Sequence, residues 1–201
     1  RRTMVRARFS LEEGAVVTGD VAGVVAGVVG RLSPEKNLPL VLAVARRLRD
    51  APGPSIRFLI VGDGPERSRI EEGIRREDLG RYVILAGESD DVASTLAACD
   101  LLVQTSDTEG LPNAIMEAMA AGLPVVATRA GGTEELVEDG QSGWVIPRGD
   151  ADALAAAIAR LAADEEMRSM LGERGRPRIA SEFSVDRMVE RTVARYGRVL
   201  R

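Results

Sequence analysis

Glu109 and Glu117 bracket the segment EGLPNAIME, which carries the clearest chemical signal in the sequence. The segment follows the apolar run 101–104, and the order of apolar run, Gly-containing loop and helix-like pattern indicates a strand, a loop and a helix. Ligands of open α/β sheets bind beyond the carboxyl ends of the strands, where both carboxylates would lie. Because an ionised carboxylate can only accept hydrogen bonds, the pair indicates a ligand with many hydroxyl groups.

The helix of this segment is expected to start at Pro112. The free N–H groups of its first turn, together with the helix dipole, would favour an anion or a polar oxygen. Asn113 and Glu117 are four residues apart and share a helical face, so Glu117 should point away from the core. Each carboxylate also has an ordinary explanation: Glu117 as an exposed helical residue, and Glu109 as a loop acid that the helix dipole stabilises.

A pair of cations follows the first confident strand. Gly30 and Arg31 come directly after the apolar run 24–29, and Lys36, the single lysine among 27 basic residues, lies five positions further on. Glycine permits close approach of a ligand to the backbone, arginine offers a planar fork for phosphate oxygens, and lysine a point charge. Two solvated surface cations are the alternative, but the acidic pair is expected on the same edge of the sheet. The loop lacks the Gly-Lys-Ser/Thr ending of a P-loop.

Glycines also follow the other expected strands. Gly62 is explained by a tight turn, and Gly87 offers a backbone edge that could meet a nucleobase. Gly131 and Gly132 precede a further helix; they could line the same cleft, or Thr133 could simply cap that helix.

Apolar, β-branched runs alternate with helical patterns along the chain, as expected for βαβ units. We therefore predict an α/β fold: a doubly wound, mainly parallel, six-stranded Rossmann-like sheet with helices on both faces and a C-terminal helical tail. Strands are expected at 24–29, 57–61, 82–86, 101–104, 124–127 and 144–146. Helices are expected at 38–49, 65–77, 90–98, 112–121, 133–138, 150–163, 165–172 and 185–200. The expected organisation is a linker or residual N-terminal segment at 1–20, a Rossmann-like ligand-binding domain at 21–181 and a C-terminal helix at 182–201.

Composition excludes several functional classes. The 201 residues carry a net charge of −4, with no basic field for nucleic acid and no apolar run long enough to span a membrane. The chain has no histidine, so it cannot supply a histidine base or triad. Its one cysteine, Cys99, indicates a reducing, cytoplasmic compartment and a place in the core. Asp150 and Asp152 precede an Ala-rich helix, so helix capping explains them better than metal binding.

Together these motifs resemble the C-terminal, donor-binding half of the GT-B-fold glycosyltransferases of family 4, the glycosyl transferases group 1. The resemblance covers 24–147 closely and the helical tail loosely. The spacing Glu-x7-Glu is specific in its context, whereas each smaller motif alone is weak. The matching segments are GR…EKN (30–37), VGDGP (61–65), S…EG…EAMAAGLPVV (106–126) and GG…ELV…G (131–143).

The resemblance implies a nucleoside-diphosphate sugar as donor, with UDP first and GDP or ADP as alternatives. It gives catalytic roles to Arg31 and Lys36, which would hold the diphosphate and stabilise the departing nucleotide, and to Glu109, which would face the donor sugar. Glu117 would bind the ribose. Such enzymes are retaining and use no metal and no cofactor in this site. The complete expected nucleotide-sugar site comprises Gly30, Arg31, Lys36, Gly62, Gly87, Glu109, Gly110, Leu111, Pro112, Asn113 and Glu117.

In this family the acceptor site and a histidine near the donor sugar belong to an N-terminal domain. The 201 residues leave no room for that domain, so the expected partner is the protein's own acceptor domain, and the chain alone should be inactive. Any peripheral membrane contact would come only through that domain. Two alternatives remain: a nucleotide-sugar epimerase on the same fold, and a non-catalytic flavodoxin-like binding or signalling domain.

Overall fold

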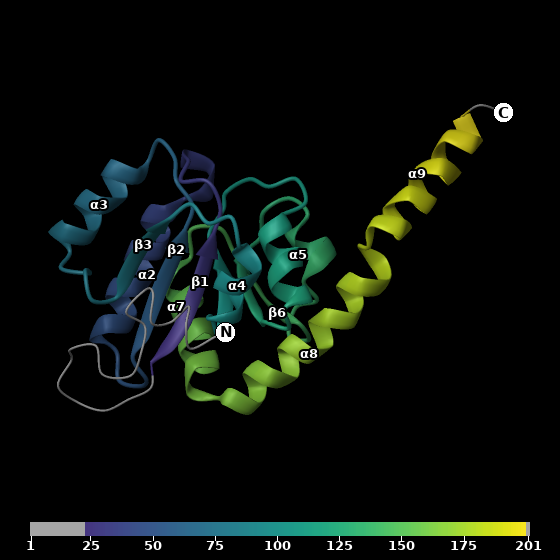
Figure 1. Cartoon of the computed structure of the whole chain (residues 1–201). Coiled ribbons are helices and arrows are strands. Elements are labelled where there is room, and N and C mark those ends of the chain that lie inside the picture. Colours follow the sequence, from purple (N-terminus) through teal and green to yellow (C-terminus); the bar gives the residue numbers. More distant parts are fainter. Residues whose placement is uncertain (1–22, 200–201) are drawn as a thin grey trace.

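The computed structural model describes residues 23–199, which form one parallel sheet covered by helices on both faces (Figure 1). The sheet order is β3-β2-β1-β4-β5-β6, and every neighbouring pair is parallel. The predicted doubly wound, Rossmann-like fold is therefore confirmed. Its strands are β1 (Val24–Val29), β2 (Ile56–Val61), β3 (Val83–Gly87), β4 (Leu101–Gln104), β5 (Val125–Thr128) and β6 (Gly143–Ile146).

The connections start from the middle of the sheet and run outward in both directions. Strands β1, β2 and β3 follow one another toward one edge, whereas β4 returns to pair with the other side of β1 before β5 and β6 follow. The direction of winding reverses between β1 and β4, and such a switch point leaves a crevice at the carboxyl ends of the two strands. This crevice lies between the loops that carry the predicted cations and the predicted carboxylates.

Helices occupy nearly all the predicted segments, with small differences at their ends except at the end of α8. The described helices are η1 (Pro34–Lys36), α2 (Leu38–Asp50), α3 (Arg67–Arg76), α4 (Val92–Ala97), α5 (Asn113–Ala120), α6 (Thr133–Leu136), α7 (Ala151–Ala163), α8 (Glu165–Glu182) and α9 (Val185–Val199). The short 3₁₀ turn η1 was expected only as a turn. The predicted segment 1–20 lies outside the described residues.

Three apolar clusters pack against the sheet. The largest joins strand residues to α2 and α7, the second joins the opposite face to α4 and α5, and a small third cluster contains Val25, Leu59, Val61 and Cys99. The inner strands are buried on both faces, so their sequences are almost continuously apolar and do not alternate. Cys99 is 2% exposed and lies against Gly27, where an added Cβ would come within 2.8 Å of Sγ. The predicted core position of Cys99 is thus confirmed.

Helix α8 is much longer than the predicted segment 165–172. It continues past Gly172 and Pro177 to Glu182. A side chain at Gly172 would overlap the carbonyl oxygen of Gly122, so this glycine permits close packing of the helix on the turn between α5 and β5. Helical propensity alone favours an end at glycine, but tertiary packing outweighs that preference here, and the prediction was wrong at this end.

Asp150 is confirmed as a helix cap. Its carboxylate accepts a hydrogen bond from the backbone N–H of Ala153 at 2.9 Å, in the first turn of α7. Asp152 instead pairs with Arg47 of α2, with 2.6 Å between Oδ1 and Nε. Capping of α7 therefore explains Asp150, and an ion pair between α7 and α2 explains Asp152.

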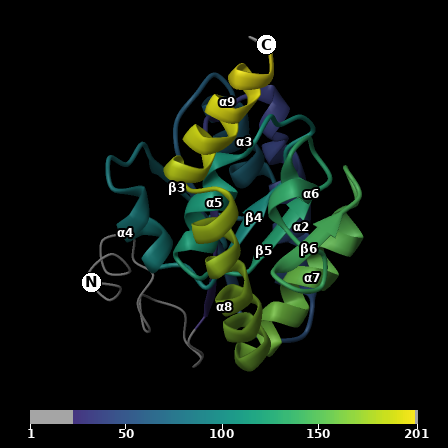
Figure 2. The ribbon, with the colours of Figure 1, turned by 90° about the vertical axis from the view of Figure 1, so that its right-hand side faces the viewer.

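Helices α8 and α9 form an arm that leaves the body of the domain beside α5 (Figure 1); in the view at right angles the arm lies in front of the body (Figure 2). Helix α8 packs against α5 and α7, whereas α9 extends away from the sheet. Within residues 23–199, no helix combines the length and the apolar character that crossing a bilayer would require.

Candidate functional site

Lys36 and Glu109 meet at the switch point of the sheet. Lys36 is the last residue of the short turn η1, which follows β1, and Glu109 lies in the loop that follows β4. The ammonium nitrogen of Lys36 donates to Oε1 of Glu109 at 2.6 Å, although the two residues are 73 positions apart. The two side chains are 25% and 11% exposed. Tertiary structure thus joins one predicted cation to one predicted carboxylate.

Three hydrogen bonds tie the two loops together beside this ion pair. The hydroxyl of Thr105 donates to the carbonyl of Lys36 at 2.9 Å, and the backbone N–H of Asp107 donates to the carbonyl of Glu35 at 2.8 Å. The amide of Asn37, a residue in the left-handed region with φ 47°, donates to Asp107 Oδ1 at 3.1 Å. Since backbone and side chains both contribute, the loops form one connected frame for the ion pair.

Glu109 has two further partners that sequence reasoning missed. The hydroxyl of Ser106 donates to Oε1 at 2.6 Å, and the amide nitrogen of Gln104 donates to the same oxygen at 3.1 Å. Ser106 stood in the matching motif without a role, and Gln104 ended an apolar run. The signal available was a polar residue at the end of a buried strand, because a buried amide requires a hydrogen-bond partner.

A recess in the floor of the crevice joins the two strand ends. It is lined by residues of β1 and β4 and of the loops that follow them, and Gly30, Arg31, Lys36, Gln104 and Ser106 are among them. A wider, open cleft of about 450 Å³ continues past Arg31 and is lined by Arg31, Gly62, Asp63, Gly64 and Glu88. Arg31 borders both hollows, so a ligand that crosses from one to the other would pass this guanidinium.

Gly62 does more than complete a tight turn. Its φ is +136°, and a side chain there would overlap the carbonyl oxygen of Gly30 in the neighbouring loop. Its N–H donates to the carbonyl of Gly87 at 2.8 Å. The structure therefore brings Gly30, Gly62 and Gly87 together on the adjacent ends of β1, β2 and β3.

Helix α5 begins at Asn113, one residue later than predicted, and Pro112 is its N-cap. Proline has no backbone N–H, so Pro112 cannot donate to a ligand, and the donors of this segment are Gly110, Leu111 and Asn113. Leu111 is 43% exposed at the rim of the site. Glu117 is exposed on α5, as predicted, and within the described residues its side chain makes no hydrogen bond.

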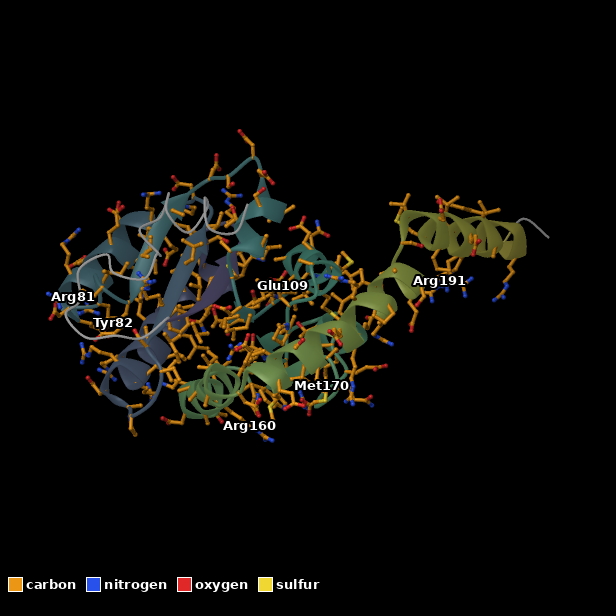
Figure 3. All side chains as sticks on the ribbon, turned by 60° about the horizontal axis from the view of Figure 1, so that its bottom comes forward. Arg81, Tyr82, Glu109, Arg160, Met170 and Arg191 are labelled. Carbon is orange, nitrogen blue, oxygen red and sulfur yellow. The ribbon has the colours of Figure 1, made fainter. Side chains whose placement is uncertain are left out.

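The loop before α6 supports the backbone of the Glu109 loop. The N–H of Gly132 donates to the carbonyl of Gly110 at 2.7 Å, and Gly131 packs directly on the carbonyl of Glu109. Thr133 does not cap the helix: its hydroxyl donates to the carbonyl of Ala130 at 2.7 Å, and the cap position belongs to Gly132. Figure 3 shows Glu109 close to α5, whereas Arg191 marks the distant arm.

The loop that follows β1 stabilises the ionised form of Glu35. The Ser33 hydroxyl donates to Glu35 Oε1 at 2.6 Å, and this hydrogen bond, with smaller contributions from Lys36 and Arg31, lowers the pKa of the Glu35 carboxyl. At neutral pH the Glu35 carboxylate therefore offsets part of the positive charge of Arg31 and Lys36. Among the described residues, no group of three or more acidic or cysteine side chains lies close enough together to hold a metal ion.

Fold and side chains together define an α/β domain of the Rossmann type, with a lysine and a glutamate paired at its topological switch point. The chain belongs to the family of Glycosyl transferases group 1, whose model matches residues 21–178. Solved structures with the same arrangement are GT-B glycosyltransferases. The resemblance noted in the sequence is thereby confirmed.

Relatives with assigned activities match most of this chain. An N-acetyl-α-D-glucosaminyl L-malate synthase of Bacillus anthracis is 34% identical over 72% of this chain and 38% of its own length. A 2-deoxystreptamine N-acetyl-D-glucosaminyltransferase of Streptomyces fradiae is 33% identical over 94% of this chain and 46% of its own. The chain thus spans less than half the length of these relatives.

Among solved structures, HepE of Anabaena in complex with UDP-glucose is similar to this chain. The TM-score is 0.83 and the identity is 27%, over 97% of this chain and 51% of HepE.

Proposed function

We propose that this chain is the donor-binding half of a retaining, metal-independent hexosyltransferase. Its donor would be a nucleoside-diphosphate sugar, and its acceptor would be held by an N-terminal domain outside the described residues. The observation that carries the proposal is the Lys36–Glu109 pair at the switch point, 2.6 Å apart and partly buried. The pair places a cation, which can bind phosphate, next to a carboxylate, which can accept hydrogen bonds from sugar hydroxyls. A ligand that contains both phosphate and sugar would use both groups.

Arg31 and Lys36 would bind the diphosphate. Lys36 has three N–H donors and uses one on Glu109, so two remain for phosphate oxygens. When the bond between sugar and phosphate breaks, negative charge grows on the leaving diphosphate. Two cations already in position would stabilise that charge in the role that a metal ion has in other enzymes.

Glu109 would accept a hydrogen bond from a hydroxyl of the donor sugar, and Glu117 would accept hydrogen bonds from the hydroxyls of the ribose. The backbone N–H groups of Gly110, Leu111 and Asn113 would add donors for the sugar and the phosphate. The open cleft beside Gly62 and Glu88 extends from Arg31 along the strand ends, and it provides space for the remaining part of a nucleotide.

UDP is our first choice of nucleotide. Support comes from HepE, whose solved complexes contain UDP and UDP-glucose and whose fold this chain shares. GDP and ADP are the alternatives.

The proposal of a second domain rests on the relatives and on the arm. The chain spans less than half of the relatives' length, and α9 extends beyond the domain beside α5 (Figure 1). Five apolar side chains of α9 are 50–71% exposed: Val185, Met188, Val189, Val193 and Tyr196. Such a helix face is expected to pack on other apolar surface, and we assign that surface to the acceptor domain. Without it the chain should not transfer sugar.

Calorimetric titration of the chain with UDP, GDP and ADP tests the proposal. We expect one nucleotide to bind, with an affinity that falls at least about tenfold in Lys36→Ala and in Glu117→Ala, because each loses a charge-assisted contact. Arg69→Ala and Glu173→Ala, which remove exposed charges from α3 and α8, serve as matched controls and should bind as the parent chain does.

Other outcomes would point elsewhere. Binding of no nucleotide, with the chain folded, contradicts the proposal and favours a flavodoxin-like binding domain. Binding that survives both site substitutions would contradict the assigned roles. Interconversion of a nucleotide sugar with its epimer by the complete protein would support the epimerase.

A further inference from the structure

Every hydrogen bond that the Glu109 side chain makes within the described residues ends on one oxygen, Oε1. The donors are Lys36 Nζ at 2.6 Å, Ser106 Oγ at 2.6 Å and Gln104 Nε2 at 3.1 Å. The other oxygen, Oε2, receives none of them. The two oxygens of this carboxylate therefore have different environments: Oε1 is held by the protein, and Oε2 is available as an acceptor.

The three donors fall into two kinds. Lys36 is charged, partly exposed and needed for a phosphate in the proposed function, so a ligand would compete for it. Ser106 and Gln104 are neutral and buried, with 0% and 6% of their surfaces exposed. A carboxylate oxygen has two lone pairs, and these two neutral donors match them. Glu109 would thus keep its orientation after Lys36 turns to a diphosphate.

The backbone beneath these two donors is also held. Thr128 of β5 donates its hydroxyl to the carbonyl of Ser106 at 2.5 Å and lies 3.5 Å from the carbonyl of Gln104. Thr128 is 1% exposed. A side chain held on a strand end by a buried neighbour is placed more reproducibly than one on a free loop.

Gln104 is an unusual residue for its position if packing were its only role. It ends β4, whose other residues are apolar and buried, and an apolar side chain of the same size would fill the space without desolvating an amide. Burial of an amide is unfavourable unless it makes a hydrogen bond. The hydrogen bond that its side chain makes within the described residues goes to Glu109.

We propose that Gln104 and Ser106 are positioning residues, which hold Oε1 of Glu109 so that Oε2 faces a hydroxyl of the donor sugar. This inference rests on the proposed function and adds two residues and an orientation to it. Neither side chain need touch the ligand, because both act through Glu109.

The test compares the dissociation constants of UDP and UDP-glucose, with UDP-N-acetylglucosamine as a second sugar nucleotide. The measured quantity is the ratio of the constant for UDP to that for the sugar nucleotide. In Gln104→Met and Ser106→Ala, which retain size and lose the donor, we expect the ratio to fall about fivefold to tenfold, while UDP itself binds within about twofold of the parent. Ser106→Thr, which keeps the hydroxyl, should restore most of the ratio.

A double-mutant cycle separates positioning from general structural damage. In a Glu109→Gln background, Gln104→Met and Ser106→Ala should change the ratio little further, because the group that they orient has already been altered. Ser142→Ala is the matched control: Ser142 is also a buried serine, but its hydroxyl accepts from the Glu138 backbone N–H. We expect it to leave the ratio unchanged.

The outcomes distinguish this inference from the proposed function. If UDP binds but Gln104→Met and Ser106→Ala keep the parent ratio, the positioning roles are wrong while the donor site stands. If no nucleotide binds, the proposed function fails. A crystal structure of the variant that carries both Gln104→Met and Ser106→Ala then tests whether these two residues orient Glu109. A Glu109 side chain with unchanged orientation in that variant would overturn the inference.

Discussion

Gly131 lies so close to the backbone carbonyl of Glu109 that any side chain at position 131 would overlap it. Gly131 also has a φ of +51°, which side chains disfavour. The neighbouring N–H of Gly132 donates to the carbonyl of Gly110 at 2.7 Å. The loop before α6 therefore supports the Glu109 loop from behind, by backbone contact that only glycine permits.

Gly131→Ala should destabilise the fold more than an ordinary glycine substitution does. We expect a loss of about 2–4 kcal/mol in the free energy of unfolding, from steric overlap in addition to the backbone conformation. The measurement is urea denaturation. Gly140→Ala is the matched control, since Gly140 has a φ of +74° and an added Cβ there would meet no other atom within 4 Å; it should lose only about 1 kcal/mol. Equal losses in the two variants would contradict the close contact.

Glu109→Gln should strengthen binding of UDP while it weakens the preference for a UDP-sugar. In the unliganded site the carboxylate neutralises Lys36 at 2.6 Å and also repels phosphate. Removal of its charge leaves the ammonium to the diphosphate, and we expect an increase of about threefold in affinity for UDP. Calorimetry at two salt concentrations measures this, with Glu134→Gln, an exposed acid on α6, as control. Weaker binding of UDP by the variant would show that Glu109 supports the phosphate site.

Arg178→Lys should destabilise the attachment of α8 to α6. The guanidinium of Arg178 donates to the carbonyls of Glu135 and Leu136 and to the carboxylates of Glu138 and Glu182. A lysine has one charged nitrogen and cannot reach all these acceptors at once. We expect a loss of about 1–3 kcal/mol in the free energy of unfolding.

Arg174→Lys provides the comparison for that measurement, because Arg174 is an exposed residue of the same helix. It should remain within about 0.5 kcal/mol of the parent. A similarly small change for Arg178→Lys would mean that the fork of hydrogen bonds contributes little to stability.

Asp152→Asn should lower stability at neutral pH and have no effect in strong acid. A hydrogen bond from Arg47, together with its positive charge, lowers the pKa of Asp152 below the ordinary value of 3.8. Because the folded pKa is the lower one, the contribution is present above the unfolded pKa and is lost as the pH falls through the folded pKa. The effect should be small, since the Asp152 side chain is 84% exposed. Melting temperatures from neutral pH to about pH 2 measure it, and a difference that persisted in acid would contradict this account.

Local sequence patterns were sufficient for most of the fold. The apolar runs, and the glycines and prolines that end them, marked six strands whose bounds differ from the observed ones by at most one residue. They erred at the end of α8, where packing between distant segments outweighs local preference: the helix continues past Gly172, which packs on Gly122. The alternatives left open for Thr133 were decided by a local contact, because its hydroxyl donates to the carbonyl of Ala130 and does not cap α6.

By itself, the sequence determined which residue types stand at the carboxyl ends of the strands, because strand and loop signals are local and parallel strands share one edge. It thereby supplied Arg31, Lys36, Glu109 and Glu117. Only the tertiary structure decided that Lys36 reaches Glu109 across 73 positions, and that Gln104 and Ser106 hold the same carboxylate oxygen. These contacts depend on strand order, register and side-chain orientation, which arise when distant segments pack together and which no local pattern encodes.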